Sequence, residues 1–153
     1  MSPGPPGPSG PPGPVAHQAS CVAIAGRGVL IEGPPGSGKS SLALALIDRG
    51  AALTGDDGVL LEPRDTTLWA LPPPRIAGLL EVRNVGLITL PATPAPVALV
   101  LRLDPAAPRF VETAERTLLA GLSLPLIRLW PGSPVLALRA EHALARHGLP
   151  PIA

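Results

Sequence analysis

The residues best suited to chemistry form one short stretch, residues 33–40, with the sequence Gly-Pro-Pro-Gly-Ser-Gly-Lys-Ser. It matches the pattern G-x-x-x-x-G-K-[ST], in which glycines let backbone N–H groups curl around a phosphate. In such a loop Lys39 reaches the β- and γ-phosphates, and the hydroxyl of Ser40 binds Mg²⁺. The stretch therefore predicts a nucleotide-phosphate site, whose expected ligands are Gly33, Pro34, Pro35, Gly36, Ser37, Gly38, Lys39, Ser40 and Ser41.

Lys39 is the one lysine among the twelve basic residues of the chain, and all the others are arginines. An ammonium group is a compact point charge that fits between phosphate oxygens, whereas a guanidinium is a broad planar fork. The competing interpretation is a Gly/Pro-rich turn that merely caps a helix. The placement of the lysine favours phosphate binding.

A phosphate loop also needs a carboxylate for the metal and a group that accepts a proton from the acceptor. Two sets of residues compete for these roles. Asp104 ends the most apolar run of the chain, and Asp56 and Asp57 lie next to each other in a glycine-flanked turn. Near a bound phosphate, like charge raises the pKa of one of two neighbouring carboxylates, which suits a base. The sequence pattern leaves both sets open.

The elements that must position these residues are mostly short strands. The pattern places the loop between a strand and a helix, and a glycine-rich loop in this setting followed by many strands indicates an α/β, strand-rich layered fold. We predict strands at 21–24, 29–32, 59–61, 67–71, 79–83, 86–90, 97–103, 117–119 and 124–129, and helices at 41–49 and 135–147.

The composition of the 153-residue chain excludes several classes of function. The net charge is +1 and aromatic residues make up 2%, which argues against nucleic-acid binding. Residues 1–14 are Pro/Gly-rich and predict a disordered tail before a single domain, residues 15–153. The single cysteine, Cys21, is expected to be a buried, unpaired residue. With neither a signal pattern nor a membrane-spanning run, we expect a cytoplasmic enzyme that binds no membrane.

Five features together resemble the catalytic domain of HPr kinase/phosphorylase. They are His17, the loop at 33–40, the segment 46–50, the Asp56–Asp57 pair, and the segment 80–87 with the sequence Leu-Glu-Val-Arg-Asn-Val-Gly-Leu. The resemblance covers residues 16–91 and is strongest to the short alphaproteobacterial members. It implies the fold of that catalytic domain and a Mg²⁺-dependent transfer from ATP to a serine of the phosphocarrier protein HPr, which regulates the phosphotransferase system. The family can also remove this phosphate.

The resemblance also implies roles for single residues. Asp57 is favoured as the proton acceptor, with Asp56 as the alternative, and His17 would lie beside this pair and help set its protonation. Glu81 would complete the metal site with Ser40. Arg83 would lie near the substrate phosphate.

The chain departs from the family at Ser41, where an acidic residue is usual, and at Asn84, where a glycine is usual. Asparagine tolerates the left-handed conformation, so the turn at Asn84 is expected to survive. A further catalytic arginine has no matching segment; Arg102, Arg109 and Arg128 are the candidates. Two alternatives therefore stay open: a small-molecule P-loop kinase or NTPase, and a non-catalytic nucleotide-sensing module. A homo-oligomer is open as well.

Overall fold

The computed structural model describes residues 13–152, so most of the predicted tail at 1–14 lies outside the described residues. The described chain folds into eleven strands and two helices. The helices are α1 (Lys39–Asp48) and α2 (Leu136–His147). The strands are β1 (Val15–His17), β2 (Ser20–Ile24), β3 (Arg27–Glu32), β4 (Ala52–Gly55), β5 (Val59–Arg64), β6 (Thr67–Leu71), β7 (Leu79–Val82), β8 (Gly86–Thr89), β9 (Ala95–Leu103), β10 (Glu115–Leu119) and β11 (Leu122–Leu129).

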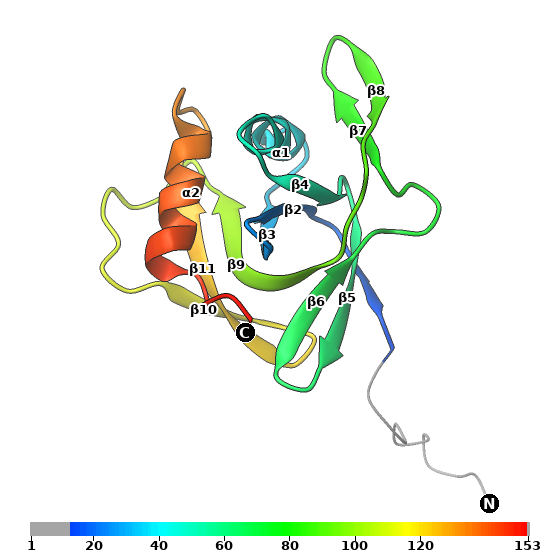
Figure 1. Cartoon of the computed structure of the whole chain (residues 1–153). Helices are drawn as coiled ribbons and strands as arrows, with labels where there is room; N and C mark the ends of the chain where they lie inside the picture. The colour runs from blue at the N-terminus through cyan, green and yellow to red at the C-terminus, as the bar shows by residue number, and fades with distance from the viewer. Residues whose placement is uncertain (1–12, 153) are drawn as a thin grey trace, which may run out of the picture.

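Nine of these strands form one curled sheet in the order β1-β5-β6-β9-β3-β2-β4, and β11 with β10 is added at β9 (Figure 1). The central strand β9 pairs with β6 at its start, with β3 along most of its length, and with β11 at its end. The β3–β9 and β9–β11 pairings are parallel, whereas all other pairings are antiparallel. This strand-rich layered sheet confirms the predicted fold class.

The centre of the sheet is buried on both faces, which is why β9 is an almost continuous apolar run. Leu99 and Leu101 pack in the cluster that includes side chains from α1 and α2, whereas Val100 belongs to the cluster on the opposite face. Alternate side chains of a strand point to opposite faces, so one strand contributes to both cores. All three residues are completely buried.

The predicted elements are present, with differences mainly at their ends. Because Arg27 already pairs with Ile24, the strands predicted at 21–24 and 29–32 are joined by a turn of Ala25 and Gly26 alone. Both have positive φ, 50° and 81°, as a two-residue hairpin turn requires. The structure adds two short strands that were not predicted, β1 and β4.

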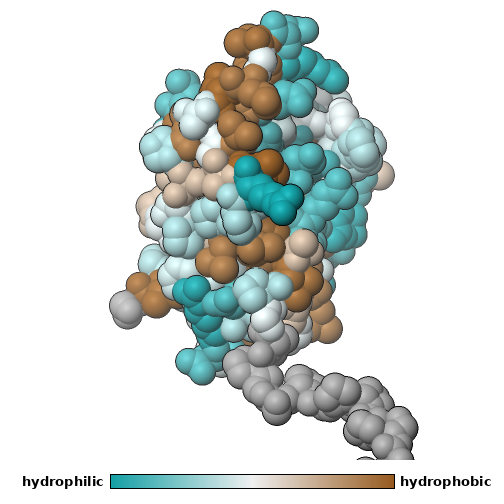
Figure 2. Space-filling view, turned by 90° about the vertical axis from the view of Figure 1, so that its right-hand side faces the viewer, coloured by the Kyte–Doolittle hydropathy of each residue, from teal (hydrophilic) through white to brown (hydrophobic). Residues whose placement is uncertain are grey.

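The β7–β8 hairpin stands apart from the main sheet and projects from it (Figure 1). Asn84 in its turn has φ 71°, so the predicted left-handed turn is confirmed. Val85 and Leu87 are exposed at 75% and 67%, and apolar residues gather over the upper part of the face that Figure 2 shows. Between residues 13 and 152, neither helix has the length and apolar character that crossing a membrane requires.

Candidate phosphate-transfer site

The glycine-rich loop connects β3 to α1, as predicted. Gly36 and Gly38 have φ of 79° and 103°, a conformation that favours glycine. A Cβ added at Gly33 would lie 2.5 Å from Ser37 Oγ, so a larger residue here would force the serine side chain to move. The first turn of α1 has no side-chain cap and no acidic residue. Its free N–H groups and positive dipole end are therefore suited to an anion.

Lys39, the first residue of α1, folds back over the loop. Its Nζ donates to the carbonyl oxygen of Gly33 at 2.6 Å and lies 3.4 Å from that of Pro34. The positive charge is thereby held above the same loop whose backbone amides would surround a phosphate. This placement fits a group that neutralises phosphate oxygens.

Asp56 is the buried anchor of the site, with 6% of its surface exposed. Its Oδ1 accepts hydrogen bonds from Ser40 Oγ at 2.6 Å and from Ser20 Oγ at 3.0 Å, and its Oδ2 accepts one from the Glu81 amide at 3.2 Å. Both carboxylate oxygens are therefore engaged, and the side chain has a fixed orientation. The structure thus joins the loop serine to the Asp-Asp turn and the β7 strand.

Asp57 lies on the open side of the same turn, exposed, with φ 59°. Together with Glu81 and Arg83, it faces a cavity of about 280 Å³ above the loop. This cavity brings together most of the predicted site residues. It is lined by Pro35, Gly36, Gly38, Lys39, Ser40, Ser41, Asp56, Asp57, Glu81 and Arg83.

His17, which the sequence analysis expected beside the aspartate pair, has its hydrogen-bonding contact with a different carboxylate. Its Nε2 is 2.8 Å from Glu32 Oε2, and it lines a separate hollow on the other side of the loop start. Within residues 13–152, His17 makes no hydrogen bond to Asp56 or Asp57. No contact therefore supports a direct effect of His17 on the protonation of the two aspartates.

Glu32 was missed by the sequence analysis although it directly precedes the loop. Its other oxygen, Oε1, accepts hydrogen bonds from Arg102 at 2.8 and 3.2 Å. Burial by itself raises the pKa of Glu32, but the bonds from His17 and Arg102 outweigh it and hold this pKa below its ordinary value. The single signal in the sequence was a charged residue at the end of an apolar strand.

Asp104, the competing metal carboxylate, does not contact the loop serine. Its Oδ2 accepts a bond from Arg128 at 3.0 Å, and its Oδ1 accepts one from the Ala106 amide at 2.8 Å. These interactions, that of Ala106 first, lower the pKa of Asp104. Of the three candidate arginines, Arg102 pairs with Glu32 and Arg128 with Asp104, and none lines the cavity of the aspartates.

The residues present fit both ATP and Mg²⁺. The uncapped start of α1 and Lys39 suit phosphates, and the Ser40 hydroxyl lies at 2.6 Å from a buried carboxylate, with Glu81 in the same cavity. Mg²⁺ is usually held by one or two carboxylates together with substrate phosphates. Within residues 13–152, no group of three or more His, Cys, Asp or Glu side chains is placed to hold a metal ion.

Comparison with known proteins identifies the family. The family model described as HPr Serine kinase C-terminal domain matches residues 14–93, more than half of the chain. The chain belongs to this family. Because the matched region runs from β1 to just before β9, it includes the loop, Asp56, Asp57 and the β7–β8 hairpin.

Curated relatives carry the same name over this region. The chain is 45% identical over 71 residues to an HPr kinase/phosphorylase of Clostridium acetobutylicum, which is 46% of this chain and 23% of that protein. It is 48% identical over 68 residues to an HPr kinase/phosphorylase of Streptococcus thermophilus, 44% of this chain and 22% of that protein. The chain thus aligns with less than a quarter of the length of these relatives.

A solved structure extends the similarity over most of the chain. The structure titled Hpr(Ser) kinase/phosphatase from Coxiella burnetii superposes with a TM-score of 0.74 at 26% identity. The match covers 86% of this chain and 94% of that one. The C-terminal part of the chain, for which the sequence analysis found no family segment, therefore belongs to the same fold.

Proposed function

We propose that this protein is an ATP- and Mg²⁺-dependent kinase that phosphorylates a serine of an HPr-like phosphocarrier protein and so regulates the phosphotransferase system. The observation that carries the proposal is the 2.6 Å hydrogen bond from Ser40 Oγ to Asp56. It joins the phosphate loop directly to a carboxylate pair in one cavity, beside the family's Glu-Val-Arg segment. ATP as donor and a phosphocarrier as acceptor would place the reaction in the cytoplasm.

The loop would bind and orient the triphosphate of ATP. The backbone amides from Gly36 to Ser41 and the Lys39 ammonium would surround the β- and γ-phosphates. Mg²⁺, when bound, would be held by Ser40 and Glu81 and would neutralise charge on the transferring phosphate. Arg83 lines the same cavity and would also neutralise phosphate charge.

The two aspartates differ in what they are free to do. Asp56 accepts three hydrogen bonds and is buried, which suits a residue that orients Ser40. Asp57 is exposed at the cavity and makes no hydrogen bond through its side chain within residues 13–152. Asp57 would therefore accept the proton from the incoming serine hydroxyl as the oxygen attacks the γ-phosphorus. In a reverse, phosphorylase reaction the same group would return the proton.

The small-molecule kinase alternative loses its main residue, because Asp104 is bound to Arg128 and lines another hollow. A nucleotide-sensing module that binds without turnover would use the same loop. The distinction between transfer and mere binding rests on the aspartates.

The decisive experiment is incubation of the full chain with γ-labelled ATP, Mg²⁺ and purified HPr, followed by analysis for serine-bound phosphate. HPr with its acceptor serine changed to alanine is the control. Label on wild-type HPr alone supports the proposal. Label on a sugar or carboxylic acid with none on protein would refute it, and ATP binding without any transfer would favour the sensing module.

A further inference from the structure

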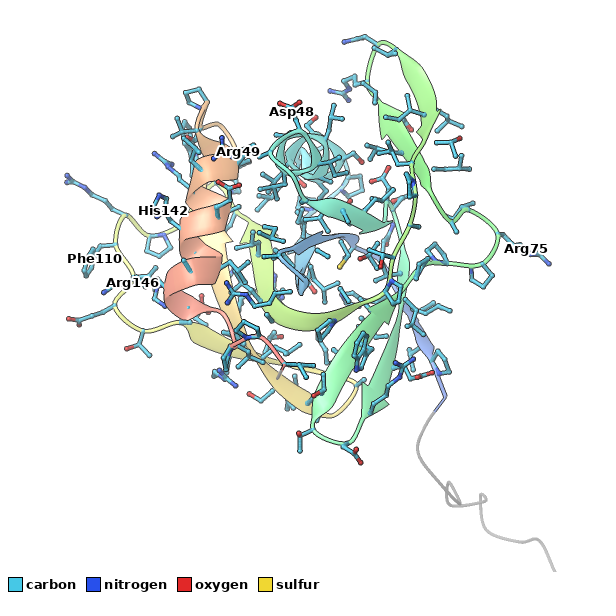
Figure 3. All side chains as sticks on the ribbon, viewed as in Figure 1. Asp48, Arg49, Arg75, Phe110, His142 and Arg146 are labelled. Atoms are coloured by element: carbon cyan, nitrogen blue, oxygen red, sulfur yellow. The ribbon has the colours of Figure 1, made fainter. Side chains whose placement is uncertain are left out.

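A third hollow, here called the basic groove, lies between α2 and the loop that follows β9. Its volume is about 460 Å³. Figure 3 shows His142 and Arg146 on the side of α2 that faces this loop, which carries Phe110. The groove is lined by Ala107, Pro108, Arg109, Val111, Ile127, Arg128, Leu129, Trp130, Arg139, His142, Ala143, Arg146 and His147, and it shares none of these with the phosphate-loop cavity.

The groove is lined by four arginines, and ion pairs compensate only one of them within residues 13–152. None of its lining residues is acidic. Arg128 is compensated, because it pairs with Asp104 and Glu115 outside the groove. Arg109, Arg139 and Arg146 have no ion pair within residues 13–152. Since the whole chain has a net charge of only +1, this cluster is a local feature and not the consequence of a basic protein.

Helix electrostatics explain only part of the cluster. Arg146 and His147 lie in the last turn of α2, where the helix dipole favours cations. Arg139 lies at the end of the first turn, where the dipole disfavours them, and Arg109 comes from a different segment. Arg139, His142 and Arg146 are spaced i, i+3 and i+7, so they form a stripe about 10 Å long on one helix face.

The groove also offers aromatic and apolar contact surface. Trp130 is 49% exposed at its edge, and Phe110 on the neighbouring loop is 75% exposed. Trp130 packs against Gly132, where an added Cβ would lie 2.7 Å from the ring, so the indole is held in place. Buried Ile127 and Leu129 form the floor. Hot spots of protein interfaces are enriched in arginine and tryptophan and lie in well-packed pockets. The groove has this composition over an apolar floor.

We infer that the basic groove binds an acidic peptide segment of a partner protein. An open stripe of two arginines and a histidine fits carboxylates spaced along an extended chain, and Trp130 would cover an apolar side chain of it. The low aromatic content of the chain and its net charge of only +1 make a nucleic acid the poorer match. Because the groove and the phosphate-loop cavity have no residue in common, this inference does not depend on the proposed kinase activity.

The chain provides its own reporter for a test. It has two tryptophans, and Trp69→Phe leaves Trp130 as the sole one while keeping a ring beneath Arg64. We expect hexaglutamate, but not hexaglutamine, to change Trp130 fluorescence in a saturable manner. Raising the salt from about 0.1 M to about 1 M, which shortens the Debye length from about 10 Å to about 3 Å, should weaken this binding strongly.

Matched double variants then locate the binding. Arg139→Gln with Arg146→Gln should weaken hexaglutamate binding by about tenfold or more, equivalent to about 1.4 kcal/mol. Arg75→Gln with Arg116→Gln removes the same charge from exposed positions outside the groove and should change affinity by less than about twofold. Circular dichroism checks that both variants are folded, which is expected because all four positions are exposed.

Three results would overturn the inference. The first is the absence of saturable hexaglutamate binding to the parent protein. The second is equal loss of affinity in both double variants. The third is that an oligothymidylate or inorganic tripolyphosphate binds more tightly than hexaglutamate and that this binding is lost in the Arg139–Arg146 double variant. That result would assign the groove to a different ligand.

Discussion

Replacing Asp57 by asparagine tests the division of labour between the two aspartates. The substitution removes the proposed base but keeps the shape of the side chain. A general base contributes about 10²- to 10⁴-fold to the rate, so the barrier to transfer should rise by about 3–5 kcal/mol. The side chain is exposed, and asparagine is readily accepted at its φ of 59°. The free energy of unfolding should therefore change by less than about 0.5 kcal/mol.

Asp56→Asn should behave differently although the two residues are neighbours. In the parent, the two carboxylate oxygens of Asp56 accept hydrogen bonds from Ser20, Ser40 and the Glu81 amide. Asparagine would replace one of these acceptor oxygens by an NH₂ group, which is itself a donor. At least one donor would lose its acceptor in a buried place, which costs about 1–3 kcal/mol. This variant should thus be less stable than the parent as well as impaired in transfer.

The assay combines single-turnover transfer of labelled phosphate to HPr, ATP binding by calorimetry, and urea unfolding. Asp65→Asn is the matched control, because Asp65 is also exposed with positive φ, 56°, in the β5–β6 turn. It should leave all three measurements unchanged. Asp57→Asn that transfers phosphate at the parent rate would refute the assignment of the base. Loss of ATP binding or of stability in the same variant would refute the argument that Asp57 has no structural role.

Three further predictions concern stability and reactivity. The pKa of Glu32 is lowered in the folded protein, so its contribution to stability is present above the ordinary glutamate pKa of about 4.3 and is lost as the pH falls through the folded-state value. In urea unfolding, Glu32→Gln should therefore be less stable than the parent at pH 7, and its stability should fall less in acid. An equal acid dependence of the two proteins would contradict this. Burial raises the pKa of Cys21 to about 12, so a thiol reagent at pH 8 should label it only upon unfolding; rapid labelling of the native protein would be the opposite result. Asn84, at φ 71°, should tolerate glycine, whereas Asn84→Ala should lower the free energy of unfolding by about 1 kcal/mol, measured by urea titration; equal stability of the two variants would exclude backbone strain at this turn.

The sequence predicted those elements whose signals are local. Strand β6, Thr67–Leu71, was predicted at its observed bounds, because alternation and flanking prolines delimit it. The helix from Leu136 to His147 differed from its prediction by one residue. Strand β4, Ala52–Gly55, has weak strand formers and exists through its pairing with β2. The two-residue turn at Ala25 and Gly26 is shorter than the gap at 25–28 between the predicted strands, because alanine rarely adopts positive φ and Ala25 alone gives no turn signal.

The candidate site was predictable where one motif carried it and not where distant segments meet. The loop, Asp56 and Asp57 were inferred from motif and resemblance, and the structure brings them into one cavity. The His17–Glu32 contact depends on how the edge strand β1 lies against the sheet. This strand has only three residues, so its sequence gives little information about its position. Arg102 joins Glu32 across 70 positions of sequence, and the basic groove likewise assembles residues from three separate segments.

The three-way pairing of β9 has a consequence for biosynthesis. This strand joins β6, β3 and β11, yet it follows β3 by more than sixty positions in the chain. A ribosome will have released the phosphate loop long before the strand that supports it. Such non-local pairing slows folding. The nascent chain should therefore stay sensitive to proteases until Leu103 has emerged from the ribosome. Before that point the phosphate loop should not bind nucleotide.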